Sequence, residues 1–431
     1  MNLTSPFSIT LFVITALALL GLPIGLAMMC GSILYLLLAG LDMGTVAEQF
    51  LNGMYSNYVI LAVPLFVLAA EIMNSGSMTE RLLRFCNVLV GRFRGGLAQV
   101  NIVQSIIFAG MSGSAIADSA ALAAILVPLM RQARYDDGLS VGLMAAGGIT
   151  APVIPPSIAF VVYGSIANVS IRELFFAGIV PGILMALSLV VAWAFVMRRQ
   201  EPQMLERIGW AERGRAVLVG VPALILPIVV VGGLRKGWFT PTEAAVIAVA
   251  YATFVGAFVY RELTFARLYH CLVNAAKTSA AVMFLIGASG VSAWLITTAN
   301  LPQEIIRLLD PIMDQKMLLM IVLTVMLLVV GTALDFTPTM LILMPMLVPV
   351  CKAAGIDLVY FGVVFVMAGA IGMLTPPVGN VLNVVASVAR TPMERVIVGV
   401  TPFLIAQIMV LWLIVLVPAV VTVPLDFMMG R

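Results

Sequence analysis

The sequence predicts an all-α polytopic membrane protein, built from two inverted repeats that each contain a re-entrant helical hairpin and a broken helix. Three observations predict this fold. Of the 431 residues, 62% are hydrophobic and 10% are charged, whereas about 25% of the residues in a soluble domain are charged. Apolar runs long enough to cross a bilayer recur along the whole chain. Breaks rich in glycine and proline interrupt four of these runs, at related spacings.

The remaining composition narrows the function. A net charge of only +3 does not indicate a nucleic-acid partner, and we expect none. The four cysteines are scattered without metal-binding or redox spacing, and the single histidine, His270, falls in a predicted loop. The sequence therefore does not favour an intramembrane enzyme with a histidine-built site.

The first apolar run, residues 7–39, has no lysine or arginine before it, and the first basic residue of the chain is Arg81. A signal peptide has a basic n-region and a shorter apolar core. We therefore expect this run to be retained as one membrane span. The predicted crossings are 7–39, 57–74, 138–167, 174–197, 216–234, 240–260, 279–298, 358–389 and 402–424.

Two further apolar stretches, 97–130 and 317–350, have helix breakers near their middle. Gly110 and Gly113 interrupt the first, and residues 331–338 interrupt the second. A single helix has no use for such breakers. A hairpin that enters the membrane and leaves by the same side requires them, with its turn buried in protein or facing a wet cavity. We therefore predict two re-entrant hairpins.

Two of the predicted crossings are also broken. Residues 147–157 read GGITAPVIPPS, and residues 369–379 read GAIGMLTPPVG. Paired prolines remove amide donors and end a helix. Helices broken at membrane depth are typical of secondary transporters.

The basic residues predict opposite orientations for the two hairpins. Six arginines flank the first hairpin, whereas three basic residues flank the second. The loops 198–215 and 261–277 are also basic, and the loop 42–48 is acidic. By the positive-inside rule, the base of the first hairpin is cytoplasmic and that of the second is outside.

An internal repeat supports this arrangement. When the chain is shifted by 221 residues without gaps, glycine, proline and glutamate positions coincide. The eight matching pairs are Gly110 with Gly331, Pro128 with Pro349, Gly148 with Gly369, Pro155 with Pro376, Pro156 with Pro377, Glu173 with Glu394, Gly178 with Gly399 and Pro181 with Pro402. Shared hydrophobicity would match leucine and valine instead. The repeats therefore cover about 57–197 and 279–424.

Each break frees backbone carbonyls and amides near the midplane, where half-helix termini can face ions. A hard cation such as Na⁺ favours oxygen ligands. Oxygen-bearing side chains stand at these places in both units: Ser112, Ser114 and Thr150 in the first, and Thr332, Asp335 and Thr375 in the second. Glycines allow close backbone approach there: Gly113, Gly331 and Gly372.

Carboxylates at membrane depth are costly and usually functional. We therefore assign Asp118 and Asp335 a functional or tip-organising role. Ser119 is interpreted as a helix-packing residue. For Glu71 two interpretations stay open, a contact with a partner or a cap on a neighbouring helix. Glu243 is expected in the first turn of a helix that Thr240 caps.

Six motifs in order resemble the large membrane subunit of tripartite ATP-independent periplasmic (TRAP) transporters. They are PLFVLAAEIM (64–73), GMSGSAIADSAAL (110–122), TAPVIPPSI (150–158), GWFTPTEAA (237–245), GTALDFTPTM (331–340) and LTPPVGNVLNV (374–384). The resemblance covers essentially the full chain. It implies a multi-pass protein of the bacterial inner membrane that is a transporter and not an enzyme.

The resemblance implies an elevator mechanism, in which a transport domain moves against a scaffold, driven by a Na⁺ gradient. Our hypothesis is that at least two Na⁺ accompany each substrate. The substrate is an organic acid: a C4-dicarboxylate, sialic acid or another sugar acid. The implied partners are a small four-helix membrane subunit, expected as a separate chain, and a periplasmic substrate-binding protein.

The domains that follow from the resemblance alternate along the chain. The scaffold comprises 1–96, with N-terminal spans and a cytoplasmic amphipathic arm, 174–316, and the C-terminal span in 391–431. The transport domain comprises the first hairpin and broken helix, 97–173, and the second hairpin and broken helix, 317–390.

The matching motifs also imply two Na⁺ sites. The first would use Ser112, Ser114, Gly147, Thr150 and Pro152, and the second Thr332, Asp335, Gly369 and Met373. The substrate and tip region would comprise Gly113, Asp118, Pro155, Pro156, Gly331, Thr375, Pro376 and Asn380. Neither lysine nor arginine occurs in the tips or breaks, so backbone amides, hydroxyls, bound Na⁺ or a residue not identified from the sequence must meet the substrate carboxylates. Proton coupling through Asp118 or Asp335 stays open as the alternative.

Overall fold

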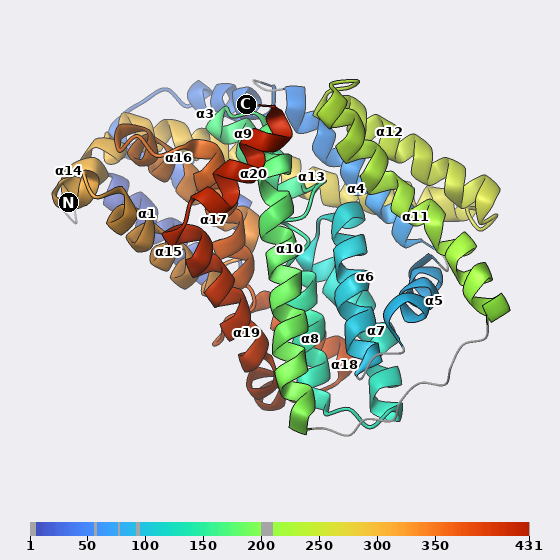
Figure 1. Ribbon diagram of the computed structural model, residues 1–431. Coiled ribbons are helices and arrows are strands. Elements are labelled where there is room, and N and C mark those ends of the chain that lie inside the picture. The colour runs from blue at the N-terminus through green and yellow to red at the C-terminus, as the bar shows by residue number, and fades with distance from the viewer. Residues whose placement is uncertain (1–5, 56–57, 76–77, 92–94, 200–209, 431) are drawn as a thin grey trace.

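The computed structural model describes residues 6–55, 58–75, 78–91, 95–199 and 210–430. Every regular element in these ranges is helical, and Figure 1 shows the helices gathered into one body. Eight of the helices are long and apolar enough to cross a membrane. The predicted all-α polytopic fold is therefore confirmed. Arg92, Arg94 and Arg207, which contributed to the orientation prediction, lie outside the described residues.

The N-terminal apolar run is not one span, so the prediction for 7–39 is wrong. It forms two helices, α1 (Pro6–Leu19) and α2 (Ile24–Ala39), which pack against each other. Gly21 at φ +89° and Pro23 separate them. Glycine reaches this backbone conformation without a steric penalty, and proline removes an amide donor. A hydropathy pattern does not register such a turn, because both sides of it are equally apolar.

The next segment forms three shorter helices. The predicted acidic loop 42–48 largely belongs to α3 (Gly44–Tyr55), which packs on α13. The crossing predicted for 57–74 contains a 3₁₀ turn at Tyr58–Leu61 and α4 (Ala62–Asn74). The amphipathic arm predicted before the first hairpin is α5 (Met78–Val90), which packs against α6 and α11.

Both predicted hairpins are present as helix pairs with two-residue turns. The first consists of α6 (Gly96–Ser112) and α7 (Ala115–Gln132), and the second of α15 (Lys316–Ala333) and α16 (Phe336–Ala353). Gly113 adopts φ +63°, and a Cβ there would lie 3.2 Å from the backbone nitrogen of Ile158. Both the dihedral angle and the close approach therefore favour glycine at the first tip.

Both broken helices are also present. Residues 149–157 separate α8 (Asp137–Gly148) from α9 (Ile158–Ala167), and residues 373–379 separate α17 (Leu358–Gly372) from α18 (Asn380–Ala389). Each break contains a cis Pro–Pro bond, at 155–156 and 376–377. A shift of 221 residues superimposes these two bonds, as it superimposes the ends of α7 on those of α16.

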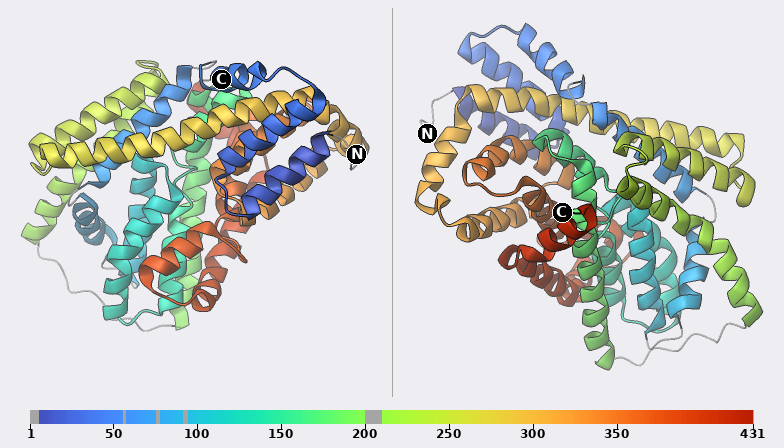
Figure 2. Two further views of the ribbon diagram at one scale, coloured as in Figure 1. Left: turned by 180° about the vertical axis from the view of Figure 1, so that it is seen from behind. Right: turned by 45° about the horizontal axis from the view of Figure 1, so that its top comes forward.

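The remaining long helices are α10 (Ile171–Val196), α11 (Trp210–Lys236), α12 (Pro241–Phe254), α13 (Phe265–Thr298) and α19 (Met393–Leu416). A π-helical turn, Val255–Val259, follows α12, and the amphipathic α14 (Leu301–Met313) follows α13. As expected, Thr240 and Glu243 form a capping box at the start of α12. Figure 2 shows α13 crossing the width of the molecule, where it packs on α2, α3, α4 and α16.

Two boundaries differ from the prediction. The basic segment 261–277 is mostly the first part of α13, so His270 lies in a helix and not in a loop. The span predicted for 402–424 ends at Leu416, and a separate helix, α20 (Ala419–Met429), follows Pro418. Proline favours such a helix boundary because it cannot donate the next backbone hydrogen bond.

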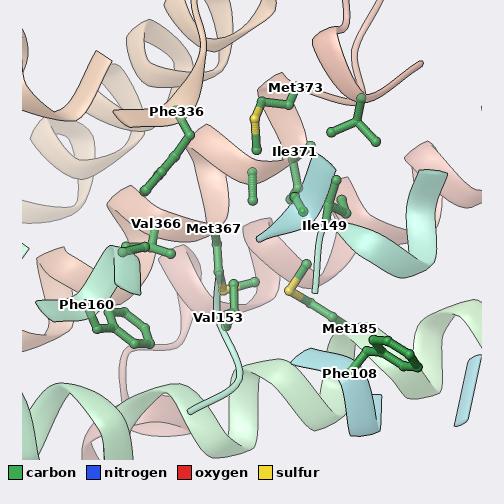
Figure 3. Close-up of a cluster of buried hydrophobic side chains, with 14 of the residues drawn as sticks. Phe108, Ile149, Val153, Phe160, Met185, Phe336, Val366, Met367, Ile371 and Met373 are labelled. Atoms are coloured by element: carbon green, nitrogen blue, oxygen red, sulfur yellow. The ribbon is translucent and has the colours of Figure 1, made fainter. Parts of the chain in front are cut away.

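The core joins the two repeats into one unit. Figure 3 shows Phe108, Val153 and Met185 from the first repeat together with Val366 and Met367 from the second. All five side chains are buried. The N-terminal half of α8 also packs backbone to backbone on α19, because a Cβ at Gly399 would lie 2.0 Å from the carbonyl carbon of Gly138. Only glycine permits this approach.

Candidate functional site

The two hairpin tips meet at one cavity of about 410 Å³. The residues that line it come from both repeats and from two helices outside the hairpins. They are residues 112–117 of the first tip, Pro152 of the first break, the start of α9, residues 335–337 and Met340 of the second hairpin, Met373, and the facing sides of α4 and α13. The cavity therefore lies where the sequence places the breaks.

The first tip is held together by its own polar groups. The Ser112 hydroxyl donates a hydrogen bond to a carboxylate oxygen of Asp118 and accepts one from the Ser114 amide at 3.1 Å. Asp118 is only 1% exposed, and its other oxygen has no hydrogen-bond partner within the described residues. Ser114 caps α7 by accepting from the Ala117 amide at 3.4 Å. A buried carboxylate with a spare oxygen is a suitable neighbour for a cation.

The first break packs directly against this tip. A Cβ at Gly147 would lie 2.4 Å from Ser105 Oγ, and one at Gly148 would lie 1.8 Å from Ser119 Oγ. The Thr150 hydroxyl donates to the Gly147 carbonyl at 2.7 Å, and the Ser157 hydroxyl donates to the Pro152 carbonyl at 2.5 Å. The Gly147 carbonyl also accepts from the Thr150 amide at 3.2 Å. The Pro152 carbonyl oxygen has a second lone pair that can still accept or coordinate.

The second tip repeats this arrangement with different side chains. Asp335 is the N-cap of α16, and its carboxylate accepts from the Phe336 amide at 2.8 Å. Gly331 lies against the second break, since a Cβ there would be 3.2 Å from Gly372 Cα and 3.4 Å from the Gly369 carbonyl oxygen. The Gly379 amide donates to the Thr332 carbonyl at 3.4 Å. Backbone carbonyls of the hairpin and the broken helix therefore lie close together here.

The structure places the predicted site residues in three groups. Those that line the cavity are Ser112, Gly113, Ser114, Pro152, Asp335 and Met373. Those of the first repeat that lie behind the first tip, outside the lining, are Asp118, Gly147, Thr150, Pro155 and Pro156. Those of the second repeat that do not line it are Gly331, Thr332, Gly369, Thr375, Pro376 and Asn380. The Thr375 hydroxyl instead donates within its own helix end, to the Ile371 carbonyl at 2.8 Å.

Sequence reasoning missed the wall opposite the hairpins. Glu71 and Asn74 from α4 and Thr278 from α13 line the same cavity. Glu71 thus faces the cavity, an outcome that neither of its two earlier interpretations included. The only available signal was a carboxylate in an otherwise apolar helix.

The electrostatics of the cavity come from carboxylates and helix ends. Glu71 and Asp335 line it, and among its described lining residues there is no lysine, arginine or histidine. The first turns of three helices also face it: Ala115–Ala117 of α7, Ile158 and Ala159 of α9, and Phe336 and Thr337 of α16. Helix N-termini favour anions, and carboxylates favour cations. The cavity is therefore suited to hold both together.

Paired hairpins and paired broken helices around one cavity that contains carboxylates are typical of secondary membrane transporters. Residues 11–420 match the family described as the tripartite ATP-independent periplasmic transporter, DctM component. The chain belongs to this family and is a TRAP transporter large permease. It is therefore a multi-pass protein of the bacterial inner membrane and a permease rather than an enzyme, as the motifs predicted.

Three relatives illustrate the family. The chain is 44% identical to the 2,3-diketo-L-gulonate TRAP transporter large permease protein YiaN of Escherichia coli, over 95% of this chain and 96% of that protein. It is 37% identical to the sialic acid permease SiaM of Vibrio cholerae, over 92% and 93%. It is 33% identical to the C4-dicarboxylate permease DctM of Pseudomonas aeruginosa, over 84% and 85%.

Two solved structures share the fold. The YdaH transporter of Alcanivorax borkumensis matches with a TM-score of 0.61 at 15% identity, over 88% of each chain. MtrF of Neisseria gonorrhoeae matches with a TM-score of 0.55 at 12% identity, over 86% of this chain and 83% of that one. At these identities the likeness supports the architecture alone.

Proposed function

We propose that this chain imports an organic acid, handed over by a periplasmic binding protein, by Na⁺-driven elevator movement together with a small membrane subunit. The observation that carries the proposal is the shared cavity, which combines carboxylates with three helix N-termini and has no cationic side chain in its described lining. The substrates for which these relatives are named, diketogulonate, sialic acid and C4-dicarboxylate, are all carboxylates.

The ions are proposed to bind at the two tips. Ser112, Ser114, Gly147, Thr150 and Pro152 would supply oxygens at the first tip, with the Asp118 charge beside them. Thr332, Asp335, Gly369 and Met373 would supply them at the second. The substrate carboxylate would then face the amides at the starts of α7, α9 and α16, with the bound ions offsetting the charges of Glu71 and Asp335.

The charge of the substrate determines the response to voltage. Two Na⁺ with a dianion carry no net charge, whereas two Na⁺ with a monoanion carry one positive charge inward. Each net charge gains about 2.3 kcal/mol per 100 mV. A valinomycin-imposed negative interior should therefore speed uptake of a sugar acid and leave uptake of a dicarboxylate unchanged.

The packing suggests a refinement of the moving body. The backbone contact of Gly138 with Gly399 joins α19 to α8, and Gln407 of α19 donates to the Met185 carbonyl of α10 at 3.1 Å. Interlocked surfaces of this kind do not slide easily. We therefore propose that α10 and α19 move together with both hairpins and both broken helices.

Uptake into proteoliposomes tests the proposal. The vesicles would hold this chain with its small subunit and binding protein, with and without an inward Na⁺ gradient. Uptake that requires Na⁺ and is lost in Ser114→Ala and Asp335→Ala supports the tip sites. A Na⁺ titration with a Hill coefficient of about one would contradict coupling to two ions.

Proton coupling is the second candidate, because Asp118 is buried and one of its oxygens has no partner within the described residues. Uptake that follows a pH gradient and is indifferent to Na⁺ would establish it. Asp118→Asn should then abolish uptake driven by the pH gradient while substrate exchange at equilibrium persists.

A further inference from the structure

A second cavity, of about 400 Å³, lies at the base of the second hairpin, on a different part of the molecule from the candidate site. It is bounded by the start of α15, the turn between α16 and α17, and the break between α19 and α20. Its floor is apolar and buried, with Met320, Ile356 and Val415 each at most 8% exposed. Its rim carries two exposed groups of opposite charge, Lys316 and Asp357.

The internal repeat places different side chains at the equivalent position of the first half. In the first repeat the same place is filled by stacked side chains, Tyr135 on Trp193, with ring centroids 5.9 Å apart. The filling is tight, because a Cβ at Gly95 would lie 2.5 Å from Trp193 Nε1 and 3.1 Å from Met197.

The shift of 221 residues replaces these three bulky side chains with smaller or shorter ones. Ile356 is equivalent to Tyr135, Ile414 is equivalent to Trp193, and Pro418 is equivalent to Met197. Lys316 stands where Gly95 is, which adds a cation at the mouth. The second repeat thus has smaller apolar side chains at these positions and an additional charge beside them.

The rim has free binding capacity for both charges of a zwitterion. Lys316 Nζ donates to the Gly355 carbonyl at 2.9 Å, which uses one of its three donors. Asp357 accepts from the Tyr360 amide at 2.7 Å through one oxygen, Oδ1. Within the described residues, Lys316 and Asp357 form no ion pair with each other or with a third group.

The position along the helices places this rim at a membrane surface. Lys316 is the first residue of the apolar helix α15, and Asp357 is the N-cap of the apolar helix α17. Charged groups at such helix ends lie at the level of the lipid headgroups, with apolar side chains below them.

We propose that this cavity binds a phospholipid with a zwitterionic aminophosphate headgroup. Its phosphate would pair with Lys316, its ammonium with Asp357, and part of an acyl chain would fill the space over Met320 and Val415. The bound lipid would supply to the second hairpin the filling that Tyr135, Trp193 and Met197 supply to the first. This proposal depends on the membrane location of the chain and not on which ion drives transport.

Native mass spectrometry of the purified chain with its small subunit tests the proposal. After delipidation, the complex is titrated with phosphatidylethanolamine and, separately, with phosphatidylglycerol of the same acyl chains. The chain should retain phosphatidylethanolamine about tenfold more tightly. Copying the first repeat with Ile356→Tyr and Pro418→Met should abolish this preference, because the new side chains occupy the cavity.

Two milder variants test the rim. Asp357→Asn should bring the two lipids close to equal affinity, and asparagine retains the N-cap function of Asp357. Lys316→Gln should weaken the retention of both lipids, because both carry the phosphate. Val329→Tyr, on the exposed face of α15 away from the cavity, is the matched control and should bind as the wild type does.

Three outcomes would overturn the proposal. One is phosphatidylglycerol bound as tightly as phosphatidylethanolamine by the wild type. Another is unchanged retention in all the rim variants. The third is a cavity that takes no lipid and becomes shielded only when the periplasmic binding protein is added, which would make it a protein-docking site.

Discussion

At the scale of single residues, Asp118 is the buried charge closest to the first tip. Its contact with the Ser112 hydroxyl fixes one oxygen, and the other is free within the described residues. Asp118→Asn keeps an acceptor for Ser112 and removes the negative charge. The Na⁺ concentration for half-maximal uptake should rise by about tenfold or more, as for other residues that support a metal ligand.

Thermal unfolding of the Asp118→Asn protein is the control for this prediction. The melting temperature should stay close to that of the wild type, because the hydrogen bond survives. If the folded Asp118→Asn protein needs the same Na⁺ concentration for half-maximal uptake as the wild type, Asp118 does not contribute to Na⁺ binding.

Glu71 is a negative charge on the wall opposite the tips, and it forms no ion pair with the residues that the structure describes. In the absence of cations it repels an incoming carboxylate. Glu71→Gln should therefore raise substrate binding without Na⁺ by about fivefold or more, which is a coupling of about 1 kcal/mol. Isothermal titration of the purified complex with substrate, with choline in place of Na⁺, measures this effect.

Glu304→Gln is the matched control, since Glu304 lies in the first turn of α14 and does not line the cavity. Wild-type transport could depend on Na⁺ while Glu71→Gln shows no gain in substrate binding without Na⁺. That result would show that another group repels the substrate carboxylate. Sequence reasoning could not find this role, because the placement of Glu71 depends on how α4 packs on α12 and α13.

At the scale of elements, the contact between the first hairpin and the first break is made by small residues. Gly148 faces Ser119, and a Cβ at Gly148 would lie 1.8 Å from Ser119 Oγ. Gly148→Ala should destabilise the protein by about 1–3 kcal/mol, the usual cost of overpacking. Thermal unfolding in detergent, followed by intrinsic fluorescence, measures the loss.

A second substitution makes the Gly148 prediction specific. Ser119→Ala removes the atom nearest to the new Cβ, and that hydroxyl has no hydrogen-bond partner within the described residues. The double variant should recover part of the loss, while the Ala115 carbonyl at 2.8 Å limits the recovery. Strictly additive effects would show that the two positions do not share this contact.

Sequence predicted the hairpins and broken helices well, because glycine and proline act locally. Gly113 ends α6, and the two Pro–Pro pairs lie in the breaks, where the pattern placed them. Sequence failed where a turn is apolar on both sides, at Gly21, and where a helix continues through charged residues, at Arg267 and His270. The composition of a segment indicates whether it lies in lipid or in water. The turn at Gly21 and the helix through Arg267 and His270 depend instead on how the helices pack.

At the scale of the whole molecule, the two repeats interlock through both side chains and backbone. Arg131 at the end of α7 donates to the Ala389 carbonyl and to the Thr391 hydroxyl, each at 2.9 Å, and so ties the first hairpin to the end of α18. Tyr163 of α9 donates to the Leu358 carbonyl at 2.7 Å. These contacts connect four of the elements that sequence assigned to the transport domain, whose boundaries stay a prediction.

We proposed that α10, α19, the hairpins and the broken helices move together. If they move against a static wall that includes α4, two cross-links should have opposite effects on transport. Leu139 of α8 and Val398 of α19 line one surface pocket, inside the proposed moving body. Asn74 of α4 and Ile116 of α7 line the candidate cavity, on opposite sides of the proposed sliding boundary. Paired cysteines at these places, in a chain whose four native cysteines are replaced, are bridged with a bifunctional thiol reagent.

The Leu139→Cys and Val398→Cys link should leave uptake close to that of the unlinked protein, because both ends move together. The Asn74→Cys and Ile116→Cys link should abolish uptake and still permit Na⁺ binding, because it holds the tip against α4. Reduction of a cleavable cross-linker should restore uptake in the second case. Blocked uptake from the first link would place α19 in the static wall, as the sequence-based boundary at residue 391 has it.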